Sequence, residues 1–89
     1  MDYESIIHAL IDDLVSNKNG LIIKKLPNEK EDEPITYLIC AEDNDIARLI
    51  GHKGTVATSL REIISIAGKL NNEKIRLKFE SLTSTSENK

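Results

Sequence analysis

Two glycines separated by two residues interrupt the most regular part of this 89-residue sequence. The loop reads GHKG at positions 51–54, and apolar residues recur at helical spacing on both sides of it. This spacing predicts a short helix over Asp45–Ile50 and a long helix from Thr55 to about Lys69. Glycine has no Cβ atom, so paired glycines permit a sharp turn and a close approach of the backbone to a ligand. We therefore expect the chain to fold around a helix–loop–helix unit.

The remaining segments supply one helix and three strands. Apolar residues at helical spacing predict a helix over Tyr3–Val15. The runs Leu21–Leu26 and Ile35–Ala41 predict two strands, which the polar loop 28–34 connects. Alternation of apolar and basic residues predicts a third strand over Lys74–Glu80. Its inward side chains are expected to be Ile75, Leu77 and Phe79, and its outward side chains Lys74, Arg76 and Lys78.

The elements follow the order α-β-β-α-α-β, which predicts an α+β fold of two layers. We expect a three-stranded sheet with three helices on one face and the basic strand residues on the other, more exposed face. The strand Ile35–Ala41 is apolar on both faces, which is typical of a central strand. A chain of this length forms one domain, expected over residues 1–80. The polar segment 81–89 is expected to be a disordered tail.

Composition limits the class of protein. The first residues are acidic where a secretory signal would be basic. No apolar run approaches the roughly 18 to 20 residues that a membrane span requires. The single cysteine, Cys40, has no partner for an internal disulfide, which fits a reducing compartment. We therefore expect a cytoplasmic protein that does not enter a membrane.

Charge is distributed unevenly along the chain, whose net charge is −3. Residues 44–79 carry seven basic and three acidic side chains, a balance of +4, so the rest of the chain carries −7. Such asymmetry is one sign of an anionic partner. Surface lysines that only keep the protein soluble would give the same charge balance. Charge alone therefore leaves open whether this segment binds an anionic partner or is simply solvated.

The loop does not match the common nucleotide-binding motifs. A Walker-type loop has four residues between its glycines and then Lys-Ser/Thr, and a dinucleotide-binding fingerprint has a third glycine within a βαβ unit. The sequence also lacks the signs of an enzyme. His8, Cys40 and His52 fall in a helix, a strand and a loop, and no motif places a base beside a nucleophile. We expect a binding protein that uses no cofactor and no metal.

The segment Ile46–Gly54 (IARLIGHKG), followed by Leu60-Arg61 and Ala67, resembles the KhpA family of small bacterial RNA-binding proteins with a single type II KH domain. The resemblance extends over about Tyr3–Glu80 and includes the order of the elements. A KH domain carries a GXXG loop that clamps four nucleotides by their backbone. His52 stands where many members of the family have lysine or arginine.

This resemblance implies sequence-tolerant binding of single-stranded RNA, in RNA chaperoning or post-transcriptional regulation. It also implies a homodimer, and a heteromer with a larger RNA-binding protein that has its own KH domain and takes part in cell elongation, division and hence cell shape. Two alternatives stay open. The chain is an interaction module that dimerises through one face of the long helix, or it binds structured RNA in ribosome assembly. The helix face in question contains Val56, Leu60, Ile63 and Ile64.

The predicted RNA site centres on the loop. Its N–H groups and the ammonium group of Lys53 are expected to hold about two phosphates, because a Cβ at either glycine would collide with sugar and phosphate. Apolar residues of the preceding helix, together with the strand Ile35–Ala41, are expected to form a wall of the groove for the bases, flanked by two arginines. The residues predicted to contact RNA are Ile46, Arg48, Leu49, Ile50, Gly51, His52, Lys53, Gly54 and Arg61.

Most of these residues also have a purely structural interpretation. Gly51 fits the end of a helix and Gly54 fits an ordinary turn. The apolar residues of the short helix fit the core as well as a groove, and Arg61 fits a solvated helix surface. Base stacking on aromatic rings is not expected to be important, because the chain has no tryptophan. Its aromatic residues are Tyr3, Tyr37 and Phe79.

Overall fold

The computed structural model of this protein describes residues 2–28, 30 and 32–82. The order of its elements confirms the predicted α-β-β-α-α-β arrangement and the α+β class. Three short 3₁₀ turns, Asp12–Leu14, Lys18–Gly20 and His52–Gly54, connect neighbouring elements. The helices and strands are α1 (Tyr3–Ile11), β1 (Ile22–Lys25), β2 (Ile35–Ala41), α2 (Asp43–Ile50), α3 (Thr55–Leu70) and β3 (Ile75–Ser81).

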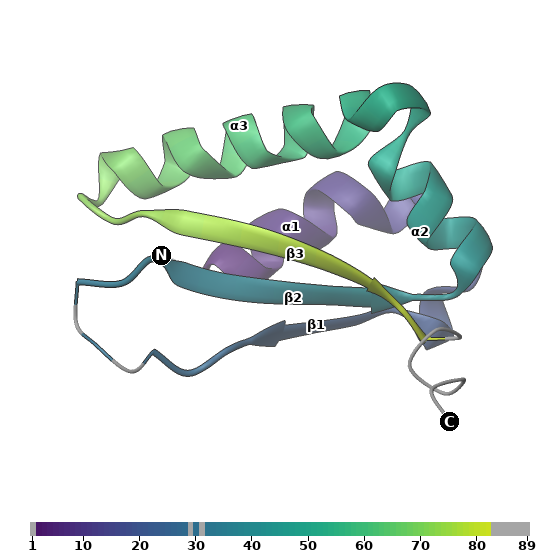
Figure 1. Cartoon of the computed structure of the whole chain (residues 1–89), viewed down its shortest axis with the longest axis horizontal. Helices are drawn as coiled ribbons and strands as arrows, with labels where there is room; N and C mark the ends of the chain where they lie inside the picture. Colours follow the sequence, from purple (N-terminus) through teal and green to yellow (C-terminus); the bar gives the residue numbers. More distant parts are fainter. Residues whose placement is uncertain (1, 29, 31, 83–89) are drawn as a thin grey trace.

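The three strands form one mixed sheet in the order β1-β2-β3, with β2 in the centre as predicted (Figure 1). β1 and β2 are antiparallel, with Ile23 opposite Ile39. β2 and β3 are parallel, with Ile35 opposite Ile75 and Ala41 opposite Ser81. Parallel neighbours require a crossover connection, and here α2, the glycine loop and α3 provide it.

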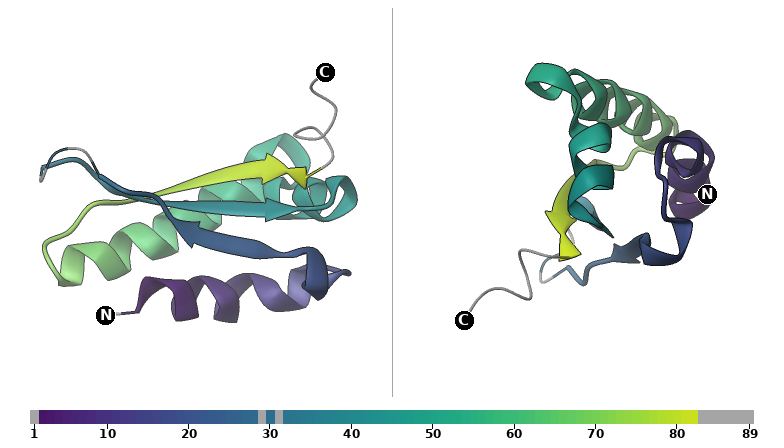
Figure 2. Two further views of the ribbon diagram at one scale, coloured as in Figure 1. Left: turned by 90° about the horizontal axis from the view of Figure 1, so that it is seen from below. Right: turned by 90° about the vertical axis from the view of Figure 1, so that its right-hand side faces the viewer.

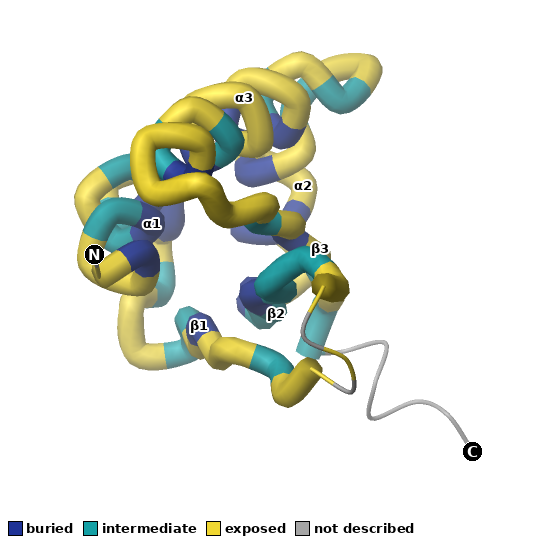
Figure 3. The backbone as a smooth tube through the Cα atoms, turned by 90° about the vertical axis from the view of Figure 1, so that its left-hand side faces the viewer, coloured by how far each residue is buried: buried dark blue, intermediate teal, exposed yellow. Residues whose placement is uncertain are grey.

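The helices lie on one side of the sheet (Figure 3), and α1 and α3 lie against each other there (Figure 2). Residues from both layers meet in a core that is closed to solvent. On β3, Leu77 is buried whereas Arg76 and Lys78 are exposed, so the predicted alternation of that strand is confirmed. The most deeply buried apolar side chains are Ile7, Ile11, Ile39, Leu49 and Ile64.

Several boundaries differ from the sequence-based expectation. β1 is one residue shorter at each end than the predicted Leu21–Leu26, and β3 begins at Ile75 instead of Lys74. α1 ends at Ile11, and Asp12–Leu14 form a 3₁₀ turn that leads to the extended and buried Val15. α2 begins at Asp43, two residues earlier than predicted. β3 continues to Ser81, and residues 83–89 of the predicted tail lie outside the described residues.

The start of α1 is joined to the turn that precedes β3. The hydroxyl of Tyr3 donates a hydrogen bond to Oε1 of Glu73 and accepts one from Nδ2 of Asn71 at 3.4 Å. The rings of Tyr3 and Tyr37 meet edge to face, with centroids 6.3 Å apart. At the end of α3, a Cβ on Gly68 would lie 2.6 Å from the carbonyl oxygen of Glu73, so this close approach requires glycine.

Candidate functional site

The base of the glycine loop is part of the packed fold. Gly51 ends α2 with φ 79° and ψ 174°, and its N–H donates to the carbonyl oxygen of Ala47 at 2.9 Å. A Cβ on Gly51 would lie 2.5 Å from Cγ2 of Val56 in the first turn of α3. Glycine is therefore required here by the packing of α2 against α3, and the predicted role of Gly51 at the helix end is confirmed.

The tip of the loop is open. His52 and Lys53 are exposed, and Lys53 (φ 58°) and Gly54 (φ 78°) both have left-handed backbone. A Cβ built on Gly54 would meet no atom within 4 Å. The turn is held by a hydrogen bond from the N–H of Gly54 to the carbonyl oxygen of Gly51 at 3.1 Å. Its outer side is thus free to receive a ligand.

The helix that follows begins without a side-chain cap. Gly54 is the N-cap of α3 and has no side-chain oxygen to accept hydrogen bonds from the N–H groups of the first turn, and that turn contains no acidic residue. Oγ1 of Thr55 donates to the carbonyl oxygen of His52 at 3.0 Å, which stabilises the turn behind it. The first N–H groups of a helix have no partner within it and carry the positive end of its dipole. This end of α3 favours an anion beside Gly54.

A buried carboxylate holds α2 in place. Asp45 is 1% exposed, and its two oxygens accept hydrogen bonds from the backbone N–H groups of Ser16 at 2.8 Å and Asn17 at 3.0 Å. These two bonds, with a smaller contribution from nearby Arg48, keep the pKa of Asp45 below its ordinary value. The helix that leads into the loop is therefore fixed to the turn after α1.

The sequence did not reveal this role of Asp45. An aspartate near the start of a helix is normally explained by the helix dipole, and that explanation predicts an exposed side chain. Nothing in the sequence marks Ser16 and Asn17 as its partners, because Asp45 follows them by 29 and 28 positions respectively. Only the tertiary fold brings the three residues together.

The two predicted arginines have different surroundings. Nη1 of Arg48 donates to Oγ of Ser16 and, at 3.1 Å, to Oδ1 of Asp45, so this side chain is directed toward the turn after α1 although it is 55% exposed. Arg61 is exposed on α3, with Cζ 5.4 Å from the centroid of the Phe79 ring. Arg61 thus lies over β3, and Arg48 belongs to the anchor of α2.

The apolar residues of α2 divide between core and surface. Leu49 is 0% exposed and Ile46 is 8% exposed, so the structure removes Leu49 from the residues that can touch a nucleotide and leaves Ile46 little surface to offer. Ile50 is 37% exposed directly before the loop. Of the three, Ile50 is available to a ligand, and the other two position the loop.

The strand beside the helices of the site is also different from the one expected. β2 is central, and its helix-facing residues Tyr37, Ile39 and Ala41 are at most 6% exposed. The edge strand β3 instead contacts both α2 and α3, and it carries Phe79 beneath Arg61. The predicted groove wall from β2 is therefore wrong, because two neighbouring strands and a layer of helices enclose that strand.

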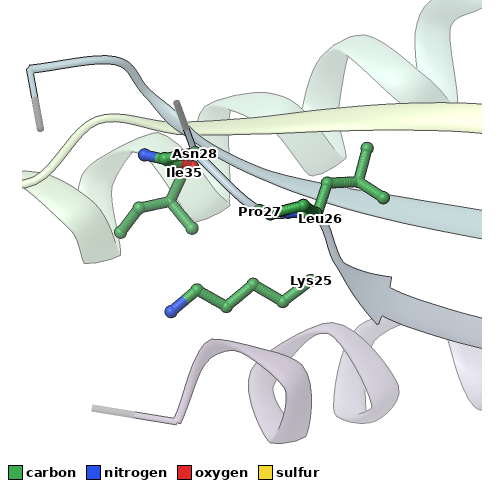
Figure 4. A pocket seen from close by; sticks show the side chains of 5 residues that line it. All are labelled: Lys25, Leu26, Pro27, Asn28 and Ile35. Carbon is green, nitrogen blue, oxygen red and sulfur yellow. The ribbon is translucent and has the colours of Figure 1, made fainter. Parts of the chain in front are cut away.

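The described residues offer little for chemistry in an enclosed site. They contain no group of three or more His, Cys, Asp or Glu side chains that could hold a metal ion. A shallow hollow lies between Lys25 and Ile35 (Figure 4), at the end of β2 opposite to the glycine loop. None of the helices in the described ranges is long and apolar enough to span a membrane. The loop is an exposed surface, suited to an extended ligand.

Comparisons with known proteins agree with this geometry. The family model for the KH domain of KhpA/KhpB matches residues 4–79. The RNA-binding protein KhpA of Listeria monocytogenes serovar 1/2a and that of Listeria innocua serovar 6a are each 29% identical to this chain over 76 residues, which cover 85% of this chain and 96% of the relative. No solved structure matches the chain. The chain therefore belongs to the KhpA/KhpB KH-domain family and has the type II KH fold.

Proposed function

We propose that this protein binds single-stranded RNA by its backbone and that residues 51–54 hold the phosphates. The relatives from Listeria are named RNA-binding protein KhpA, and the GXXG loop is the phosphate-contacting element of KH domains. The observation that carries the proposal is the uncapped N-terminus of α3 beside Gly54, whose missing Cβ leaves open space. The oxygens of a phosphate placed there accept hydrogen bonds from N–H groups at the positive end of a helix.

Each exposed residue around the loop has a proposed role. Lys53 supplies a flexible positive charge to the phosphates, and His52 lies beside it on the same turn. Ile50 offers an apolar surface to the first base or sugar next to the loop. Arg61, above Phe79, is placed to contact nucleotides that continue from the loop toward β3.

Loose sequence preference follows from the aromatic residues. Tyr3 and Tyr37 are 4% and 6% exposed, and Phe79 is half-buried with Arg61 over its ring. Stacking of bases on open aromatic rings, which is worth roughly 1–3 kcal/mol per base in other single-strand binders, is thus not offered by these residues. Binding that reads the backbone and few bases suits an RNA chaperone or a post-transcriptional regulator.

Reversal of charge at the loop tests the proposal. The double variant His52→Asp with Lys53→Asp should keep its fold and lose binding to a single-stranded oligouridylate in a fluorescence anisotropy titration. The matched control is Lys18→Asp with Asn19→Asp, an exposed pair of adjacent residues with the same change in charge. With two to four phosphates engaged, the wild-type log–log salt slope should be roughly −1.5 to −3. Equal loss in both variants would reject the loop as the site.

The same titration distinguishes the kinds of RNA. A single strand that binds more tightly than a hairpin of equal length supports the proposed function. A preference for the hairpin would instead favour the alternative of structured RNA and ribosome assembly. A salt slope near zero would mean that phosphates do not dominate the interaction, which would contradict the proposed chemistry.

Self-association is a second proposed function, and one surface favours it. Of the residues predicted to form this surface, Leu60 and Ile64 are 5% and 0% exposed and belong to the core, whereas Ile63 is 44% exposed. The outer side of α3 presents Ile63 together with Ile66 and Leu70, which are 60% and 77% exposed. Exposed apolar residues gathered on one side of a helix are typical of an interface.

We propose that these three residues, Ile63, Ile66 and Leu70, join two copies of the chain or join it to a larger KH-containing protein. Sedimentation at several concentrations should reveal a dimer that Ile66→Glu dissociates. The control variant Glu62→Gln alters an exposed neighbour by removing one negative charge, and it should leave the sedimentation mass unchanged. A monomeric wild type at all concentrations would contradict the homodimer.

A further inference from the structure

The face of the sheet opposite to the helices has an unusual composition. The pairing of residues between neighbouring strands places three rows of side chains across this face, because paired residues point to the same side of a sheet. One row is Lys24–Leu38–Lys78, a second is Ile22–Cys40–Glu80, and Thr36–Arg76 begins a third. Among the described elements none covers this face, and the helices all lie on the other side (Figure 3). We call these residues the open face.

Charge on the open face is positive although the protein is acidic. Lys24, Arg76 and Lys78 contribute three positive charges and Glu80 one negative charge, a balance of +2, whereas the whole chain carries −3. All three basic residues are exposed. None of them forms a salt bridge with another of the described residues. They are available to an anionic ligand.

The spacing of these cations suits a chain of phosphates. Arg76 and Lys78 are two residues apart on β3, or about 6.6 Å along the strand, and Lys24 lies two strands away from Lys78, at about 9.6 Å. Small and apolar side chains lie between them, with Leu38 and Cys40 half-buried by their neighbours. Lysine and arginine at such separations can bind successive phosphates, as a point charge and as a planar fork respectively.

The edge strand β3 connects the open face with the glycine-loop site. Side chains alternate along a strand, so Phe79 lies under Arg61 on the helix side whereas Lys78 and Arg76 lie on the open face. Within the described part of the chain, β2 is the single neighbour of β3 in the sheet. A nucleic acid strand that passes Arg61 therefore has to cross only the free edge of β3 to reach Lys78.

We propose that the open face is a second contact surface for the same single-stranded RNA, engaged by nucleotides that continue past the glycine-loop site around the edge of β3. This inference rests on the proposed RNA-binding function. A protein partner is less well matched, because the core of a protein–protein interface is depleted in lysine and enriched in aromatic residues. The open face has three exposed cations and no aromatic side chain in its rows.

Probe length separates the two surfaces. Four nucleotides fill the GXXG loop site, and about twelve nucleotides can also reach the open face. The double variant Arg76→Gln with Lys78→Gln should bind a four-nucleotide oligouridylate like the wild type and bind a twelve-nucleotide oligouridylate more weakly. The matched control, Lys18→Gln with Lys69→Gln, removes the same charge from exposed residues elsewhere and should bind both probes like the wild type.

Salt dependence gives the size of the effect. Loss of two phosphate contacts should make the log–log slope for the long probe shallower by about 1.4, because each contact to a single strand contributes about 0.7. Between 50 and 200 mM salt the wild type should therefore lose about sevenfold more affinity for that probe than the double variant does. The slope for the short probe should be the same for both proteins.

Four results would overturn the inference. Equal weakening of both probes would mean that the substitutions act through the loop or the general charge of the protein. No weakening of either probe would mean that the lysines and arginine only protect the edge of the sheet from pairing with another chain. A lower mass of the double variant in sedimentation would assign the open face to a protein interface. Failure of the wild type to bind either probe would overturn the proposed function and this inference together.

Discussion

Gly51 and Gly54 bracket the loop symmetrically in the sequence, but their surroundings differ. A Cβ on Gly51 would collide with Val56 at 2.5 Å, whereas a Cβ on Gly54 would meet nothing within 4 Å. The base of the loop is thus part of the packed fold, and its tip has room for a ligand. One GXXG pattern therefore serves two purposes, and mutations at its two ends should have separable effects on stability and on binding.

The substitution Gly51→Ala should have the largest effect and should act on stability. Its backbone, φ 79° and ψ 174°, is in a region that essentially only glycine occupies. Strain of this kind costs about 1–3 kcal/mol, and the collision with Val56 adds about 1–3 kcal/mol of overpacking. Urea denaturation should show the loss, and Val56→Ala in the same chain should restore part of it. An unchanged unfolding midpoint would contradict the packed base.

The substitution Asp45→Asn should come next, again at the base. It keeps the size of the side chain and one acceptor for the N–H groups of Ser16 and Asn17, but it removes the negative charge that both N–H groups and Arg48 face. Denaturation should show a smaller loss than for Gly51→Ala. Affinity for RNA should fall less than stability does, since the anchor is remote from the loop tip.

The pH dependence of stability should identify Asp45 as charged. Its pKa is below the ordinary value of about 3.9, so its contribution is fully present above that value and is lost as the pH falls through it toward the lowered pKa. The stability difference between wild type and Asp45→Asn should therefore shrink between about pH 5 and pH 3. Asp2, whose bonds to Ser5 also lower its pKa, titrates in both proteins and cancels in the comparison. A difference that stays constant to pH 3 would contradict this assignment.

Substitutions of Gly54 should separate binding from stability. Gly54→Ala places a Cβ in open space but in left-handed backbone, which costs about 1–2 kcal/mol. Asparagine tolerates this conformation better, so Gly54→Asn should be nearly as stable as the wild type. Both variants should bind a single-stranded oligouridylate about tenfold more weakly, or about 1.4 kcal/mol. Normal affinity of Gly54→Asn would place the phosphate elsewhere.

The smallest effect is expected at His52. The variant His52→Lys places a second permanent positive charge beside Lys53 on the exposed turn, so it should bind a single-stranded oligouridylate modestly more tightly than the wild type. Its log–log salt slope should be steeper by about 0.7 if the new charge contacts one phosphate. The same titration at several salt concentrations measures both quantities. Equal slopes for the two proteins would remove position 52 from the site.

Local patterns in the sequence predicted most of the fold. The bounds of β2 agree with the prediction, and α3 extends one residue further than expected. Both elements could be predicted because hydrophobic periodicity and the glycines at the ends of the helices are local features of the sequence. The pattern did not predict which apolar residues of α3 face outward, since Ile63 and Ile64 are adjacent and only the packing of α1 and β3 decides between them.

The candidate site was likewise predicted in part. The loop and its exposed residues follow from local sequence and from the family resemblance. The buried role of Asp45 and the position of β3 beside the helices depend on strand order and on contacts between distant segments. Hydrophobic periodicity does not determine on which side of β2 the parallel strand β3 is added. The sequence therefore predicts β2, and not β3, as the strand that lines the groove.

The parallel pairing of β2 and β3 also has a consequence for the timing of synthesis. Partners such as Ile35 and Ile75 are 40 residues apart, and long-range parallel pairing forms slowly. Gly54 is synthesised 27 residues before Ser81, or about 1 to 5 s earlier at ordinary rates of translation. During that interval the loop exists without the strand that completes its surroundings. A nascent chain should therefore become able to bind RNA only after β3 has been synthesised and has paired with β2.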